Sequence, residues 1–148
     1  MSIQFYHLTI TSLDKALPKI LEKACSAGYR ALVTVDSEEK LEQIDQMLWK
    51  YDTVGFLPHG TSKDKQPENQ PILISTIIEP VNNANLLMVI DGKFVDEAAK
   101  FERVFDIFDG KDIKSVESAR ARWKKYKGSG HEMLYFKQNE RGSWEKAA

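Results

Sequence analysis

The sequence predicts an α/β fold: a three-layer α/β/α sandwich around a mainly parallel sheet, Rossmann-like but without a nucleotide-binding loop. Strand-like and helix-like patterns alternate along the chain, which is typical of parallel strands joined by crossover helices. Two short runs, 31–35 and 86–90, are continuously apolar, as strands are when helices cover both faces of a sheet. The length of 148 residues, with 42% hydrophobic and 29% charged residues, predicts one globular domain, 1–148.

Four elements are expected in the first third of the chain: a strand at 3–8, a helix from about 12 to 27, a strand at 31–35 and a helix from 37 to about 51. Thr11 or Ser12 can cap the first helix and Ser37 the second, because a side-chain oxygen at this position accepts an unbonded backbone N–H. Pro18 lies inside the first helical pattern, so that helix is either kinked there or starts later.

The rest of the chain begins with an irregular segment, 55–71, which we interpret as an exposed loop. After it we expect strands at 71–78 and 86–90, a short helix at 95–100, a strand at 103–108, a turn at Asp109-Gly110, a long helix at 113–127 and a last edge strand at 133–138. Strands that alternate with helices in this way favour a parallel sheet.

Motifs that carry nucleotide or metal chemistry are missing. The turn after the first strand, 8–13, has no glycine, so it is neither a dinucleotide fingerprint nor a P-loop. The three histidines and the single cysteine show no metal-ligand spacing. Asp36 and His59 could be site residues, but we interpret them as a helix-entry residue and a turn residue. We therefore expect no cofactor and no metal, and an enzyme of an unrecognised type stays open.

Composition points to a cytoplasmic protein. The single Cys25 excludes an internal disulfide framework and fits a reducing compartment, with a buried structural thiol as the favoured interpretation. The first residues do not resemble a signal peptide, and the run at 86–90 is too short to cross a bilayer. The formal net charge of −1 means that binding of DNA or of an acidic peptide needs a local basic patch.

The helix at 113–127 carries such a patch. At helical spacing one face is apolar: Val116, Ala119, Trp123 and Tyr126. A basic stripe is expected directly beside it: Arg120, Lys124 and Lys127. Arg122 and Lys125 are expected to point elsewhere. The helix is either an amphipathic helix with a solvated basic face, or a shelf for a short acidic peptide with a hydrophobic end or for single-stranded nucleic acid.

Four segments together resemble the chi subunits of bacterial DNA polymerase III. They are the opening strand Ile3-Gln4-Phe5-Tyr6-His7-Leu8, then Leu48-Trp49 followed by Phe56-Leu57-Pro58-His59, then Pro71-Ile72-Leu73-Ile74, and the basic helix Ala119-Arg120-Ala121-Arg122-Trp123-Lys124-Lys125-Tyr126-Lys127 with Gly130. Each motif is weak alone, but their order and spacing are fairly specific.

The resemblance implies a parallel-rich α/β fold and a non-catalytic accessory subunit in DNA replication. It implies two partners: the psi subunit, which tethers chi to the clamp loader, and the acidic C-terminal tail of single-stranded-DNA-binding protein. Carried over by motif, the tail site is Trp49, Arg120 and Lys124, with Phe108 and Trp123 as apolar walls. Val116 stands where the family has a further basic residue. The motifs do not place a surface for psi. The alternatives are direct binding of single-stranded nucleic acid and a small α/β enzyme.

Overall fold

The computed structural model describes residues 2–51 and 58–147. Within them, eight strands form one sheet in the order β3-β4-β2-β5-β6-β1-β7-β8. The strands are β1 (Ser2–Leu8), β2 (Ala31–Thr34), β3 (Gly60–Thr61), β4 (Ile72–Ser75), β5 (Leu86–Val89), β6 (Arg103–Asp109), β7 (Glu132–Gln138) and β8 (Trp144–Lys146). Every neighbouring pair is parallel except β7 and β8, which are antiparallel. The mainly parallel sheet is therefore confirmed.

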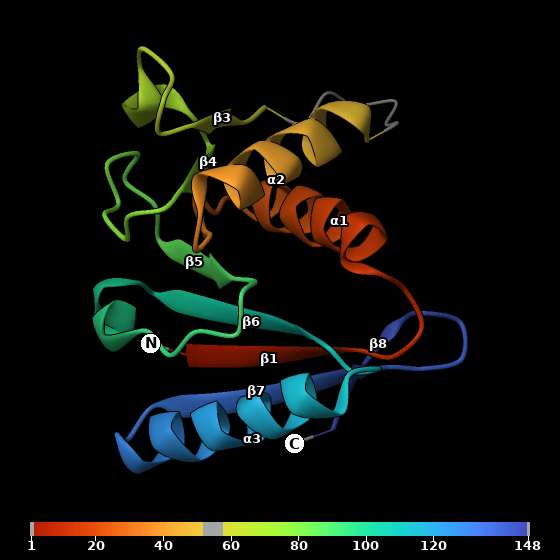
Figure 1. The fold of residues 1–148 in the computed structure, drawn as a ribbon. Coiled ribbons are helices and arrows are strands. Elements are labelled where there is room, and N and C mark those ends of the chain that lie inside the picture. Colours follow the sequence, from red (N-terminus) through yellow and green to blue (C-terminus); the bar gives the residue numbers. More distant parts are fainter. Residues whose placement is uncertain (1, 52–57, 148) are drawn as a thin grey trace.

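Helices cover both faces of this sheet, as Figure 1 shows. The helical elements are α1 (Leu13–Ser26), α2 (Glu38–Lys50), the short 3-10 turns η1 (Pro67–Asn69) and η2 (Asp96–Lys100), and α3 (Ile113–Gly128). α1 and α2 lie on one face, and α3 lies on the other. The three-layer α/β/α arrangement is thus the one that the sequence predicts.

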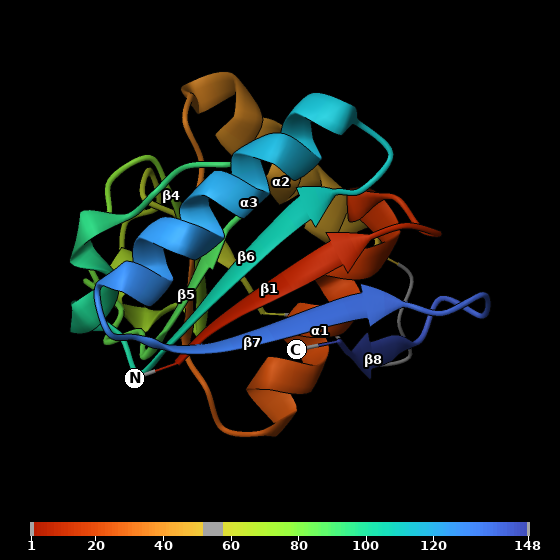
Figure 2. The ribbon, with the colours of Figure 1, turned by 90° about the horizontal axis from the view of Figure 1, so that it is seen from below.

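The direction of the crossovers explains why α3 lies on the face opposite to α1 and α2. From β1 the chain passes through α1 to β2, on one side of β1 in the sheet, whereas from β6 it passes through α3 to β7, on the other side. Right-handed crossovers that run in opposite directions place their helices on opposite faces. In Figure 2, α3 consequently lies on the near side of the sheet, while α1 and α2 lie behind it.

The core has two halves, one on each face of the sheet. Val33 and Met88 pack toward α1 and α2, while their chain neighbours Leu32 and Leu87 pack toward the α3 face, and all four are fully buried. The alternation explains why β2 and β5 are continuously apolar in the sequence.

The helix starts agree with the sequence in most respects. Ser37 caps α2, since its side chain accepts the backbone N–H of Lys40 at 3.1 Å. Ser12 is the first flanking residue of α1 but makes no capping bond with its side chain. α1 begins at Leu13 and runs through Pro18, so the alternative of a later start is wrong.

Several strand boundaries differ from expectation. The strand at 133–138 is not an edge: β7 lies between β1 and β8, and the edge strand β8 was missed. β8 has only three residues, too few to show a period of two. β4 ends at Ser75 rather than near 78, and β3 lies inside a segment that was expected to be irregular.

Arg122 points away from the basic stripe, as expected, but the sequence did not predict where it lies. Its side chain is 5% exposed and forms a two-pronged ion pair with Asp106 of β6: Nε donates to Oδ2 at 2.7 Å and Nη2 to Oδ1 at 2.9 Å. Asp106 is completely buried. A buried carboxylate requires such a partner, so this pair fastens α3 to the sheet.

Candidate functional site: a basic aromatic groove on α3

A groove of about 400 Å³ runs along α3 and the strands beneath it. We call it the α3 groove. Its apolar lining is Phe108, Val116, Ala119, Trp123, Tyr135 and Ala147, and its charged lining is Arg120 and Lys124. A mostly apolar hollow with a few charged groups at its rim is the usual composition of a peptide or ligand site.

Three elements build the groove. β6 contributes Phe108 and β7 contributes Tyr135, and both strands flank β1 in the sheet. α3 contributes Arg120 and Lys124, which are four residues apart and therefore lie on the same side of the helix, one turn from each other. The small side chain of Ala119 is 2% exposed, so the helix lies close to the strands at this point.

Ring contacts hold the walls of the groove in place. Trp123 packs edge-to-face on Phe5, with 5.4 Å between ring centroids, and on Tyr135, with 5.7 Å. Phe108 stacks on the ring of His7 at 4.7 Å. Aromatic pairs at these distances and angles are favourable, so we infer that the walls are preformed rather than assembled by a ligand.

The charges at the rim are available to a ligand. Arg120 and Lys124 are both exposed, and within residues 2–51 and 58–147 no hydrogen bond or ion pair engages either side chain. By contrast, Lys125, next along the helix, lies 4.0 Å from the centroid of the Phe94 ring. The groove therefore offers one guanidinium and one ammonium to an anion.

His7 lies behind the groove and does not add to its charge. Its Nδ1 is hydrogen-bonded to the hydroxyl of Tyr135 at 2.5 Å. Burial lowers the pKa of His7, and the positive charges of Lys137 and Arg120 lower it further. His7 is therefore neutral at neutral pH, and the attraction for an anion comes from α3.

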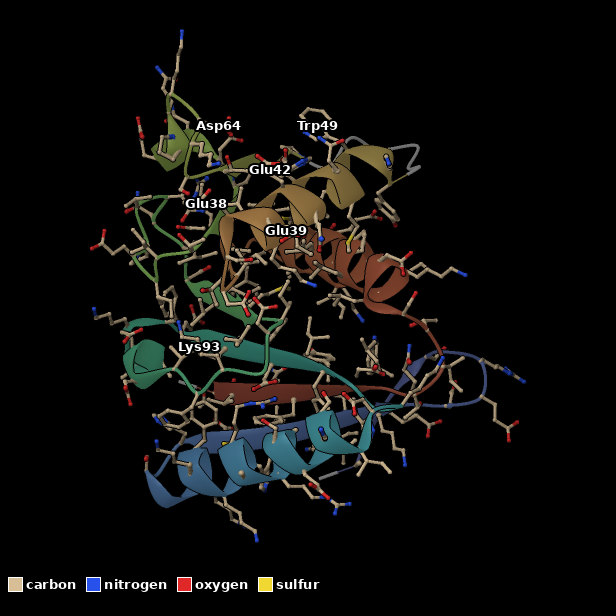
Figure 3. All side chains as sticks on the ribbon, in the orientation of Figure 1. Glu38, Glu39, Glu42, Trp49, Asp64 and Lys93 are labelled. Carbon is tan, nitrogen blue, oxygen red and sulfur yellow. The ribbon has the colours of Figure 1, made fainter. Side chains whose placement is uncertain are left out.

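The structure brings together four of the residues expected at the site, Phe108, Arg120, Trp123 and Lys124. It does not bring Trp49 to them. Trp49 belongs to α2, on the opposite face of the sheet, as Figure 3 shows. One site containing all five residues is therefore not formed. Tyr135 and Ala147 were missed, because nothing in the sequence tells that β7 lies beside β1.

Trp49 belongs to a surface of its own. Its side chain is 56% exposed, and its ring lies 4.7 Å from the ring of His59. His59 is 6% exposed, and its Nε2 is 3.2 Å from a carboxylate oxygen of Asp45. A shallow hollow beside these rings is also lined by Pro58, Asp64, Lys65, Gln66 and Gln70. We call this region the Trp49 surface; Phe56 and Leu57 of the Trp49 motif lie outside the described residues.

An α/β enzyme often has its catalytic acids at the carboxyl ends of its strands. In this chain a hydrogen bond joins two aspartates there. The backbone N–H of Asp36, after β2, donates to the carboxylate of Asp91, after β5, at 2.8 Å. Burial raises the pKa of Asp91. In the described part of the chain, no three His, Cys, Asp or Glu side chains gather in a way that could hold a metal ion. Cys25, expected to be buried, is half-buried.

None of the helices in the described residues has the length and apolar character needed to span a bilayer.

Comparisons with known proteins agree with the resemblance of the motifs. The family described as DNA polymerase III chi subunit, HolC, matches residues 1–134. A Rickettsia prowazekii (strain Madrid E) protein named "Probable DNA polymerase III subunit chi" is 26% identical over 97% of this chain and 90% of its own length. The DNA polymerase III subunit chi of Haemophilus influenzae (strain ATCC 51907 / DSM 11121 / KW20 / Rd) is 28% identical over 86% of this chain and 90% of its own. That of Escherichia coli (strain K12) is 23% identical over 82% of each.

Proposed function

The chain belongs to the DNA polymerase III chi subunit family, and from that premise we propose that it is a non-catalytic adaptor of the cytoplasmic replication machinery. It links the clamp loader, through the psi subunit, to single-stranded-DNA-binding protein. The contact with that protein is made to its acidic C-terminal tail, which ends in phenylalanine. The observation that carries this proposal is the α3 groove, where Arg120 and Lys124 stand beside an aromatic hollow.

The chemistry of the groove matches such a tail. Arg120 can bind a carboxylate with two parallel hydrogen bonds, including the carboxylate that ends a chain, and Lys124 supplies a point charge. The phenylalanine ring fits between Phe108, Trp123 and Tyr135. Exposed charge pairs of this kind each contribute on the order of 1 kcal/mol, and the buried ring contributes more. Because the attraction is electrostatic, the affinity falls as salt rises.

The three tryptophans allow this site to be tested directly, because each lies in a different region: Trp49 on α2, Trp123 in the α3 groove and Trp144 on β8. The indole N–H signals of ¹⁵N-labelled protein are assigned with single Trp→Phe variants. A peptide with the sequence of the tail is then titrated into wild-type protein. We expect the Trp123 signal to shift with saturation, while the Trp49 signal stays in place.

Charge-reversal variants separate the groove from general attraction. Arg120→Glu should weaken tail binding by about tenfold or more, because it removes a charged pair and adds repulsion. Lys127→Glu is the matched control: it makes the same charge change on the same helix, at an exposed residue outside the groove. If both variants weaken binding of the peptide equally, the peptide is attracted by net charge and the groove is not its site.

Direct binding of single-stranded DNA is the alternative for the same helix. A short oligothymidylate titrated under the same conditions decides between the two. To bind along its length, single-stranded DNA needs a continuous row of cations and aromatic rings on which its bases can stack. The α3 groove has two cations, and its rings pack on one another. If the oligonucleotide binds and the peptide does not, the nucleic-acid function replaces the adaptor function.

An adaptor also needs a second, separate surface. We propose that the Trp49 surface binds the psi subunit, because an exposed tryptophan is the side chain most enriched among residues that dominate protein–protein binding. The test is co-purification of co-expressed psi with the wild type, Trp49→Ala and Arg120→Glu. Trp49→Ala should lose psi and retain the tail peptide, and Arg120→Glu should do the opposite. If Trp49→Ala still co-purifies with psi, the Trp49 surface is not the binding site for psi.

A further inference from the structure

A second aromatic hollow lies on the α1 side of the sheet, on the face opposite to the α3 groove. It has a volume of about 290 Å³ and is lined by residues of α1, β1, β6, β7 and β8. The residues that matter for its chemistry are Tyr6, Phe105, Phe136, Trp144, Lys23 and Arg103. We call it the Trp144 cleft.

The aromatic side chains of the cleft form one packed cluster around Tyr6. The Tyr6 ring stacks on Phe136 with 5.2 Å between centroids, and meets Phe105 and Trp144 edge-to-face, each at 5.0 Å. Phe136 and Trp144 remain half-buried. The cluster is thus rigid, and part of its apolar surface still faces water.

Arg103 gives the cleft its charge. Its Nε donates to the hydroxyl of Tyr29, and its guanidinium lies 5.4 Å from the centroid of that ring. These contacts hold the side chain, yet within the described residues no partner engages its two terminal nitrogens. A guanidinium held by Nε and left with a free fork is oriented to receive a carboxylate.

The charge of the cleft has a single sign. Lys23 of α1 is exposed at its rim, and none of the described residues that line the cleft carries a carboxylate. We propose that the Trp144 cleft is a second peptide-binding site, which takes a segment of a partner protein with carboxylates beside a bulky apolar side chain. The apolar side chain contacts Phe136 and Trp144, and a carboxylate pairs with Arg103.

The same features argue against a nucleic-acid strand as the occupant. Two cations do not make a track along which several phosphates could be neutralised. This site goes beyond the adaptor contacts proposed above, and its existence does not depend on them.

The probe for the experiment is a synthetic peptide blocked at both ends, acetyl-Asp-Glu-Asp-Leu-Phe-Gly-amide. It has no chain-terminal carboxylate, which disfavours the α3 groove as a site for a tail end. It is titrated into ¹⁵N-labelled protein, and the three indole signals are followed. We expect a saturable shift of the Trp144 signal, and no such shift with acetyl-Lys-Arg-Lys-Leu-Phe-Gly-amide.

Two variants locate the contact. Arg103→Glu should lower the affinity for the blocked acidic peptide by about tenfold. The response of the Trp123 signal to the tail peptide should stay as in wild type. Because Arg103 also contacts Tyr29, its replacement could disturb the fold. A second variant, Lys23→Glu, therefore changes a charge at an exposed residue of the cleft. Its matched control is Lys19→Glu, an exposed lysine one turn earlier on α1 and outside the cleft. Lys23→Glu should weaken binding and Lys19→Glu should not.

The proposal is overturned by any of three results. The acidic peptide could shift only Trp123 or Trp49, a short oligothymidylate could shift Trp144 when the peptide does not, or the Trp144 signal could move with protein concentration alone. The last result would make the cleft a contact between two copies of this chain. None of these results bears on whether Arg120→Glu weakens the tail peptide, so the two sites succeed or fail separately.

Discussion

Replacing Arg122 by glutamine should be far more harmful than the same replacement at Arg120, although both arginines lie on α3 two residues apart. Arg122 is 5% exposed and pairs with Asp106, which is completely buried. It also donates to the backbone carbonyl of Gly92 at 3.0 Å and to the hydroxyl of Ser118 at 2.7 Å. Arg120 is exposed and has no such partners among the described residues.

The magnitude follows from what Arg122→Gln leaves behind. The carboxylate of Asp106 stays buried without its counter-charge, and breaking a buried pair in this way costs about 3–5 kcal/mol. For a chain of this size each kcal/mol corresponds to about 2–4 °C in melting temperature, so the midpoint should fall by roughly 10 °C. Arg120→Gln should stay within about 0.5 kcal/mol of wild type, as surface substitutions do.

The loss should also depend on pH. Burial raises the pKa of Asp106, and Arg122 acts in the opposite direction, so removing the guanidinium raises this pKa further above the unfolded value of about 3.9. A carboxyl group whose pKa is raised in the folded state contributes stability at low pH, and this contribution is lost as pH rises through the folded pKa. The deficit of Arg122→Gln should therefore be smaller near pH 5 than near pH 8.

Urea denaturation of wild type and both variants at these two pH values measures the free energies of unfolding. Equal deficits for Arg122→Gln and Arg120→Gln would refute the buried ion pair. A deficit of Arg122→Gln that grows as pH falls would refute the account of Asp106.

Three further substitutions test single contacts by the same denaturation measurement. Tyr126→Phe removes the hydroxyl that accepts the buried backbone N–H of Val95 at 2.9 Å, and should cost about 1–3 kcal/mol; a neutral result would mean that another acceptor replaces it. Gly110→Ala places a Cβ 2.1 Å from the ring of His7 and should cost about 1–3 kcal/mol by overpacking; a neutral result would mean that the His7 ring moves aside. Gln138→Leu removes the amide oxygen that accepts three successive backbone N–H groups after β1, and should cost about 1–3 kcal/mol; no loss would show that water satisfies them.

The fold could be predicted from the sequence because its strongest signals are local. The continuous apolar runs of β2 and β5 predict strands that are buried on both faces, and the helical period of α3 predicts one buried side of a helix. Both are found in the structure. The edge strand β8, Trp144–Lys146, could not be predicted, because three residues are too few to show a periodic pattern. Its place in the sheet depends on pairing with β7, which is a tertiary property.

The buried position of Arg122 was not predicted, for a physical reason. A helical wheel treats every cation as solvent-facing, but a cation points inward when a buried carboxylate awaits it. The sequence does contain that carboxylate: Asp106 lies between Phe105 and Ile107, in the otherwise apolar middle of β6. Reading a charged residue inside an apolar strand as half of a pair would have directed the search to a basic residue of α3.

The structure brings together the expected site residues that lie on α3, with Phe108 of β6, and it separates Trp49 from them. Arg120, Trp123 and Lys124 line one groove because helical spacing alone places them together. Trp49 was added by motif, and a motif holds no information about which face of the sheet its helix covers. The direction of each crossover decides that, and it is unknown until the strand order is known.

The separation of Trp49 from the α3 groove suits an adaptor better than a single shared site would. Partners at the two places approach opposite faces of the sheet, so neither needs to displace the other. Between them lie strands whose residues are buried on both sides, such as Leu32 and Val33 in β2. A close-packed layer of this kind resists deformation. Under the proposed adaptor function, the two partners would therefore bind at the same time, and the strength of the link would be set by the weaker of the two contacts.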